Sequence, residues 1–156
     1  MFNLAVPVLL LCLCGIGEAG FFSGCVQEAN RSRVQDSCVF VPDVWLKSET
    51  YRNLGHLALA DPTMYPHHRN ATHLSTVLHV TRAANQVLNG IVTRLEFTTV
   101  ESSCKLSDPY SKEICLPIDS QPNGICQARF RYTRSLKLED VMCEPGLWEN
   151  FESPLY

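Results

Sequence analysis

A short segment between two strand-like runs constrains the fold of this chain more than any other feature. The run from Leu74 to Asn85 is rich in Val, Leu and Thr, and apolar and polar residues alternate after Gly90. This alternation has the period of a half-buried strand. Asn89-Gly90 lies between the two runs, and both residues tolerate the positive φ angles of a tight type I′ turn. The sequence therefore predicts a projecting antiparallel hairpin with Gln86 to Gly90 at its tip.

Length and composition indicate one globular domain with a single core. The chain has 156 residues, of which 46% are hydrophobic and 19% charged, and its formal net charge is -3. Such a small charge favours no class of partner. The sequence has no basic stripe, no Gly-rich phosphate loop and no run of interleaved basic and aromatic residues, so we expect no nucleic-acid partner.

The first 19 residues have the pattern of a signal peptide. Leu4 to Cys14 is almost wholly apolar, and Gly17 and Ala19 suit cleavage after small residues. The apolar run is too short for a bilayer, which takes about 20 residues. Its leading end carries no Lys or Arg, so only the α-amino group supplies positive charge there. We expect a secreted, extracellular protein whose residues 1–19 are removed and which has no membrane partner.

The cysteines predict a disulfide-stabilised domain. Of the 8 Cys, two lie in the signal peptide, and those that remain are Cys25, Cys38, Cys104, Cys115, Cys126 and Cys143. An even number in a secreted chain indicates disulfides, although the residues alone leave many pairings open. A zinc site is the alternative, but the usual close spacing of cysteines and histidines is absent from the sequence. We expect no metal and no cofactor.

Two tripeptides match the N-glycosylation pattern and predict a glycoprotein. They are Asn30-Arg31-Ser32 and Asn70-Ala71-Thr72. If Asn30 and Asn70 carry glycans, both belong on the surface.

The N-terminal part predicts an arm and then a helix. Residues 20–42 form a polar arm with little periodicity, bracketed by Cys25 and Cys38, and Pro42-Asp43 marks a helix start. The apolar residues that fall near one helical face are Leu46, Tyr51, Leu54, Leu57 and Ala58. We expect Gly55 to pack closely against a sheet.

The C-terminal part predicts a long cysteine-bounded loop and a second hairpin. Cys126, Ala128, Phe130 and Tyr132 would share one strand face. Thr133-Arg134-Ser135 would be a turn, followed by a closing strand with Leu136 and Leu138 facing the core and its register open beyond Glu139. The predicted fold is α+β: one helix wrapped by a four- to five-stranded antiparallel sheet, with both turns at one edge.

Several motifs resemble those of the cystatins. Gln86-Val87-Leu88-Asn89-Gly90 resembles their Gln-x-Val-x-Gly hairpin, and the order of elements from Tyr51 to Cys143 is similar to that of secreted type 2 cystatins. Local sequence, such as Asn53-Leu54-Gly55-His56, is most similar to that of salivary cystatins of ticks. The resemblance implies a cystatin-like domain at 43–143, followed by a tail at 144–156. It also implies disulfides Cys104–Cys115 and Cys126–Cys143, which leaves Cys25 and Cys38 as a third pair in the arm.

The resemblance implies a function as well. Cystatins are reversible, tight-binding inhibitors of papain-like cysteine proteases, so cathepsins of the L, S or B type are the expected partners of a monomeric inhibitor. A wedge made of the arm and two turns would enter the protease cleft. The residues expected to contact the protease are Gln86, Val87, Leu88, Asn89 and Gly90 in the hairpin, Val39 and Phe40 in the arm, and Thr133, Arg134 and Ser135 in the second turn.

Two departures from the family pattern keep a second function open. Many cystatins have Pro-Trp where this chain has Thr133-Arg134-Ser135, and glycines where it has Val41-Pro42. Proline fixes φ and stiffens the arm. The alternative is a non-inhibitory secreted protein with the cystatin fold, which binds another partner through the arm, Arg129, Arg131 and the tail.

Catalytic and metal-binding interpretations are weaker. Cys104 could be a nucleophile with His79 as its base, but cysteines in an even-numbered secreted set are far more often bridged. We therefore expect no enzyme. The histidines that could suggest a metal are His67, His68, His73 and His79, yet they lack ordered carboxylate or cysteine neighbours.

Overall fold

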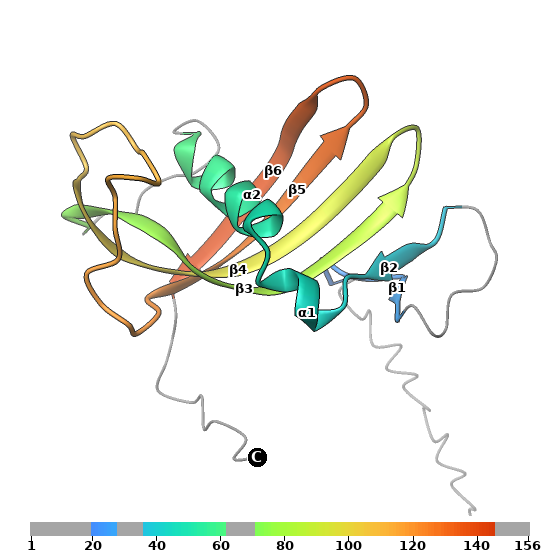
Figure 1. The fold of residues 1–156 in the computed structure, drawn as a ribbon, viewed down its shortest axis with the longest axis horizontal. Helices are drawn as coiled ribbons and strands as arrows, with labels where there is room; N and C mark the ends of the chain where they lie inside the picture. Colours follow the sequence, from blue (N-terminus) through green and yellow to red (C-terminus); the bar gives the residue numbers. More distant parts are fainter. Residues whose placement is uncertain (1–19, 28–35, 62–70, 146–156) are drawn as a thin grey trace, which may run out of the picture.

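The computed structural model describes residues 20–27, 36–61 and 71–145, and in them a helix crosses one face of a curled sheet (Figure 1). The elements in chain order are β1 (Cys25–Val26), β2 (Cys38–Phe40), α1 (Asp43–Leu46), α2 (Glu49–Ala60), β3 (His73–Val87), β4 (Ile91–Lys105), β5 (Gly124–Tyr132) and β6 (Leu136–Pro145). The sheet has the order β1-β2-β3-β4-β5-β6. The predicted α+β class is confirmed, but the sheet is 6-stranded instead of four- to five-stranded.

The arm is more regular than the sequence predicts. β2 pairs antiparallel with β3, with Cys38 opposite Gln86 and Phe40 opposite Ala84. β1 has 2 residues and pairs with β2 in parallel. The prediction of an arm without regular structure, drawn from its lack of periodicity, was wrong at β2, because β2 satisfies its main-chain groups on β3, a distant strand that the local sequence does not reveal.

The predicted hairpin is the centre of the sheet. β3 and β4 have 15 residues each, and Val87 lies opposite Ile91. Residues 88–90 therefore form the loop, which is one residue longer than the predicted two-residue turn. Asn89 and Gly90 do have positive φ angles, of 49° and 118°.

The helical region begins at Asp43 as predicted, but it is interrupted. Ser48 has φ -70° and ψ 150°, which is extended backbone between α1 and α2. Its carbonyl oxygen accepts a hydrogen bond from the Arg52 N–H at 3.3 Å, so Ser48 starts a second helix as its N-cap. The Ser48 side chain makes no capping hydrogen bond, so the change in backbone conformation alone marks the start of α2.

The face of α2 that packs on the sheet differs from the predicted face at one position. Ala58 and Leu59 are buried in the core, whereas Leu57 is 50% exposed. Successive helical residues point about 100° apart, so Leu57 points away from the side on which Ala58 and Leu59 are buried. Gly55 lies against the sheet as predicted: a Cβ there would be 3.0 Å from Val77 Cγ2.

The last two strands follow the predicted alternation except at their tips. Cys126, Ala128 and Phe130 are buried, but Tyr132 is exposed. Leu138 packs against the core, whereas Leu136, the first residue of β6, is exposed. The register shifts after Arg129, since Arg129 lies opposite Asp140 and Phe130 lies opposite Leu138. Glu139 is the extra residue of this bulge.

Candidate functional site

Two loops lie together at one end of the sheet (Figure 1). One is the loop 88–90 between β3 and β4, and the other is the loop 133–135 between β5 and β6. Arg131 Nη1 donates a hydrogen bond to the Leu88 carbonyl oxygen at 3.1 Å. A Cβ on Gly90 would lie 2.9 Å from Thr133 Cγ2 and would overlap the Tyr132 carbonyl oxygen. The two predicted turns thus share an edge and touch each other; we call this end of the molecule the loop end.

The first loop is held by its own backbone. The Leu88 N–H donates to the Gly90 carbonyl oxygen at 2.9 Å. Gly90 has φ 118°, a conformation that residues with a side chain rarely adopt, and the neighbouring loop leaves no room for a Cβ. The tip is therefore fixed before any partner binds.

Four large apolar side chains form a row beside the loops. Val87 lies opposite Ile91, Ile91 opposite Tyr132, and Tyr132 opposite Leu136. Directly paired residues point to the same face of a sheet, so the four side chains line one face across four strands. Their exposed fractions are 60%, 44%, 51% and 43% in the order of the row. We call these residues the apolar row.

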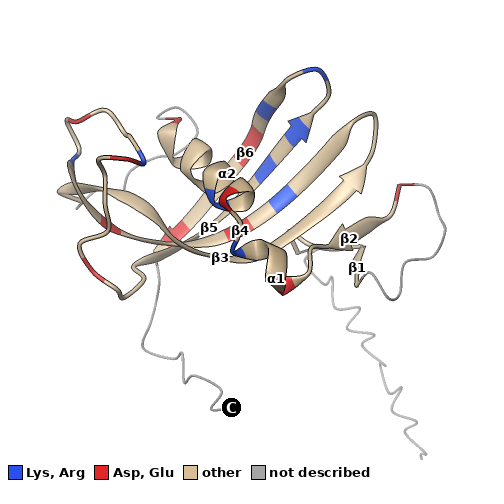
Figure 2. Cartoon of the chain, viewed as in Figure 1, with Lys and Arg blue, Asp and Glu red and all other residues tan. Residues whose placement is uncertain are grey.

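The second loop is tied to the first through charged side chains. Thr133, Arg134 and Ser135 are exposed. Behind them, the Glu139 carboxylate pairs with Arg129 Nε at 3.2 Å and accepts a hydrogen bond from Arg131, which holds the Glu139 pKa below its ordinary value. Arg131 thereby joins β6 to the loop 88–90. Figure 2 shows the arginine and lysine bands of β4, β5 and β6 towards this end.

The predicted arm contacts, Val39 and Phe40, lie in β2 and are half-buried. The Phe40 ring centroid is 5.6 Å from that of Phe22, and the Arg82 guanidinium lies over both rings. Phe40 is therefore used within the molecule. The arm meets the end of β3, next to the first loop, through Gln86. The side-chain amide of Gln86 donates to the Asp36 carbonyl oxygen at 2.8 Å.

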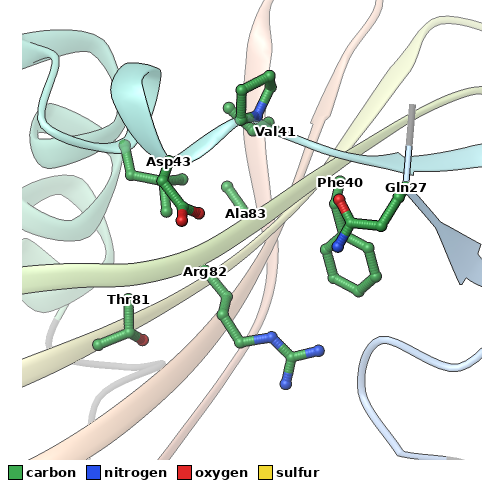
Figure 3. Close-up of a pocket in the computed structure, with 9 residues that line it drawn as sticks. Gln27, Phe40, Val41, Asp43, Thr81, Arg82 and Ala83 are labelled. Carbon is green, nitrogen blue, oxygen red and sulfur yellow. The ribbon is translucent and has the colours of Figure 1, made fainter. Parts of the chain in front are cut away.

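A hollow of about 310 Å³ flanks the arm on the side away from the loops. Figure 3 shows Gln27 and Phe40 at one side of it and Asp43 at the other. Arg82 and Thr81 of β3 complete its wall. These groups come from three stretches of the chain and hold no arrangement of nucleophile and base, so we assign no chemistry to the hollow.

The disulfides leave no free thiol among the described cysteines. The pairs are Cys25–Cys38, Cys104–Cys115 and Cys126–Cys143. Cys104 is therefore unable to act as a nucleophile. His73 Nδ1 lies 2.7 Å from Glu101 Oε1, and His79 is exposed. In residues 20–27, 36–61 and 71–145, no cluster of His, Cys, Asp and Glu could hold a metal ion.

A buried polar link that no sequence pattern indicated lies at the opposite end of the sheet. His56 Nδ1 lies 2.5 Å from the Tyr110 hydroxyl, which is also 3.2 Å from Thr76 Oγ1. Burial lowers the His56 pKa from 6.5 to about 4, with Arg52 and Lys112 adding to the effect, so the ring is neutral at pH 7 and shares a hydrogen bond with the tyrosine hydroxyl. The residues are 54 positions apart, and no local pattern predicts such a pair.

Some predictions fall outside the described residues. These are the signal peptide at 1–19, the glycosylation sites Asn30 and Asn70, the histidines His67 and His68, and the tail beyond Pro145. In the part that the structure describes, the helices are too short or too polar to cross a membrane.

Comparisons with known proteins find relatives of this chain that are named as cystatins. No family model matches it. It is 30% identical over 112 residues to salivary cystatin-L of Ixodes persulcatus, which covers 70% of this chain and 72% of the relative. It is also 30% identical over 78 residues to mialostatin of Ixodes ricinus. The matched stretch covers 49% of this chain and 52% of the relative. The chain thus spans about half of the length of mialostatin.

Solved structures share the fold. The crystal structure of mialostatin, a gut cystatin from the hard tick Ixodes ricinus, has a TM-score of 0.53 at 23% identity, covering 65% of this chain and 94% of that chain. The salivary cystatin from the soft tick Ornithodoros moubata has a TM-score of 0.57 at 21% identity, covering 71% and 99%. The predicted cystatin fold is confirmed.

Proposed function

The chain belongs to the cystatin family, and from this premise we propose that it is a reversible, tight-binding inhibitor of papain-like cysteine proteases of the cathepsin L, S or B type. Cystatins are inhibitors, so the chain is not an enzyme. We also propose that it is a secreted salivary glycoprotein and a monomer. Its disulfides suit an oxidising compartment, and relatives are named salivary cystatins.

The observation that carries the proposal is the loop end with its apolar row. Single exposed apolar residues are ordinary, but four in one cross-strand row beside two touching loops form a patch typical of a protein contact. Strand pairing fixes the row, and the first loop is fixed by its backbone. Little conformational entropy is therefore lost when this edge enters a cleft, which favours tight binding.

Each part of the loop end has a proposed role. Val87 and Leu88, at 60% and 41% exposure, provide apolar contact. Asn89-Gly90 forms the narrow tip that approaches the protease backbone, and the loop 133–135 contacts the other side of the cleft. In the arm, Phe40 packs on Phe22, so we assign the protease contact to Val39.

The test is an equilibrium titration of the oxidised protein against papain, a cathepsin L-type and a cathepsin B-type protease. We expect sub-micromolar inhibition by the wild type and a loss of at least about 100-fold in Gly90→Glu, because a side chain there overlaps the second loop and adds charge to an apolar contact. Gly20→Glu is the matched control: it adds the same charge where a Cβ has nothing within 4 Å, and we expect full inhibition.

The alternative, a non-inhibitory binding protein, is favoured by the packed state of the arm, whose Phe40 lies against Phe22 and under Arg82. An arm used inside the molecule contributes less to a protease cleft. If well-folded wild-type protein at micromolar concentration inhibits none of the three proteases, the inhibitor proposal is wrong and the alternative replaces it.

A further inference from the structure

The N-terminal segment 20–27 is fastened to the sheet, and we call it the clasp. The Cys25–Cys38 disulfide, with Cα atoms 4.4 Å apart, and the parallel pairing of β1 with β2 hold one end. Phe22 is 8% exposed and packs with Cys38 and Ala84. Ala83, the neighbour of Ala84, faces the helix-covered core, and successive strand residues face opposite sides. The clasp therefore covers the face of the sheet that α2 leaves open.

Arg94 of β4 lies where the clasp, the arm and the end of β3 meet. Its Nη1 donates to the carbonyl oxygens of Phe21 and Ser23, both at 3.1 Å. Its Nη2 donates to Gln86 Oε1 at 3.4 Å, and the amide of Gln86 in turn donates to the Asp36 oxygen at 2.8 Å. One guanidinium thus joins the clasp to Gln86, and Gln86 joins the start of the arm.

A general stabilising role does not explain an arginine at this position. Arg94 lies directly opposite Arg129 in the β4–β5 pair, and like charges placed opposite each other across two strands destabilise a sheet. Among the described residues, no carboxylate forms an ion pair with Arg94, whereas Arg129 pairs with Glu139. What arginine supplies is a rigid planar fork that reaches several acceptors at fixed angles.

We propose that Arg94 is a positioning residue that fixes Gln86 and the clasp relative to each other, so that the arm and the loop 88–90 meet a partner as one rigid unit. The proposal concerns the free protein. Its consequence for inhibition rests on the proposed function, in which a prearranged edge binds more tightly than a mobile one.

The test compares Arg94→Lys with Arg129→Lys, which makes the same substitution on the facing residue. Lysine keeps the charge but lacks the fork, so we expect amide hydrogen exchange at 36–40 and 86–90 to become about tenfold faster in Arg94→Lys while exchange in α2 is unchanged. Arg129→Lys should leave both regions unchanged. A general loss of stability would instead accelerate exchange throughout the sheet, and that result would overturn the proposal, as would faster exchange in the clasp alone.

Inhibition is the second measurement. If the wild type inhibits, we expect Arg94→Lys to bind about tenfold more weakly, mainly through faster dissociation, and Arg129→Lys to bind like the wild type. An unchanged inhibition constant in Arg94→Lys would overturn the proposed consequence for binding. If the wild type does not inhibit, the proposed function fails, and hydrogen exchange still decides whether Arg94 positions Gln86.

Discussion

The loop end and the opposite end, where the long segment 106–123 lies, both expose large apolar side chains. At the loop end these residues sit on paired strands, in one row. At the opposite end Ile114, Leu116 and Ile118 are 69%, 56% and 57% exposed, but they belong to a loop that is attached to the sheet and to α2. Its anchors are the Cys104–Cys115 disulfide and the Tyr110 hydroxyl against His56.

The difference separates two uses of the same sheet. At the opposite end, a disulfide and a side-chain hydrogen bond hold a long loop in place. At the loop end, the paired strands hold two short loops, and the apolar side chains remain exposed. We therefore expect changes at the opposite end to alter stability and changes at the loop end to alter binding. Mutations at distant sites are usually additive, so each end can be tested separately.

The largest expected effect is on stability at the opposite end. Removing the Cys104–Cys115 disulfide by Cys104→Ser with Cys115→Ser, at a sequence separation of 11, should lower the free energy of unfolding by about 3 kcal/mol. Urea denaturation measures this loss. Under conditions where the variant remains folded, its inhibition constant should stay within about twofold of the wild type. A parallel loss of inhibition would show that the two ends are coupled.

A second effect at the opposite end depends on pH. The His56 pKa is about 4 in the folded protein and 6.5 in the unfolded chain, so between these values the unfolded chain binds the proton more readily. The contribution of His56 to stability is therefore fully present above pH 6.5 and is lost as the pH decreases towards 4, by about 2 kcal/mol for a ring that is not wholly shielded from solvent.

Urea unfolding at a series of pH values measures this dependence. His56→Gln, which cannot take up the proton, is the control and should flatten the curve over the same range. A wild-type curve with no slope between pH 6.5 and 4 would contradict the assignment of a neutral, buried His56.

The smallest expected effect is at the loop end and concerns the apolar row. Tyr132 lies between Ile91 and Leu136 and is 51% exposed, so Tyr132→Ala should weaken inhibition about tenfold with little change in stability. Tyr132→Phe keeps the ring and should inhibit like the wild type. Ile118→Ala, which truncates a residue 57% exposed at the opposite end, is the matched control. Equal losses in Tyr132→Ala and Ile118→Ala would remove the distinction between the ends.

The sequence predicted those parts of the molecule that depend on local patterns. Alternation predicted the β3–β4 hairpin and the buried face of β5, and Asn89-Gly90 predicted positive φ angles at the tip. Gly55 predicted a close approach of α2 to the sheet. The pairs Cys104–Cys115 and Cys126–Cys143 came from the family resemblance, since spacing alone does not select among pairings.

The missed features depend on contacts between distant residues. Arg94 donates to main-chain oxygens of the clasp, and carbonyl groups of this kind are present at every residue, so no sequence pattern indicates which one is used. The apolar row became visible only when the register placed Tyr132 opposite both Ile91 and Leu136. The prediction that Leu57 lies on the buried face of the helix was wrong, because helical periodicity does not locate the boundary of that face to a single residue.

The short strand β1 also has a consequence for the solution behaviour of the protein. Without it, β2 would end the sheet and present its unpaired main-chain groups to any extended chain nearby. β1 occupies that side at Cys38 and Val39, and a two-residue strand offers little edge of its own. Short or covered edges are how soluble proteins avoid joining sheet to sheet. The disulfide that fastens the clasp therefore also keeps β2 covered, so that at this one of the two sheet edges little main chain is open to pairing with another molecule.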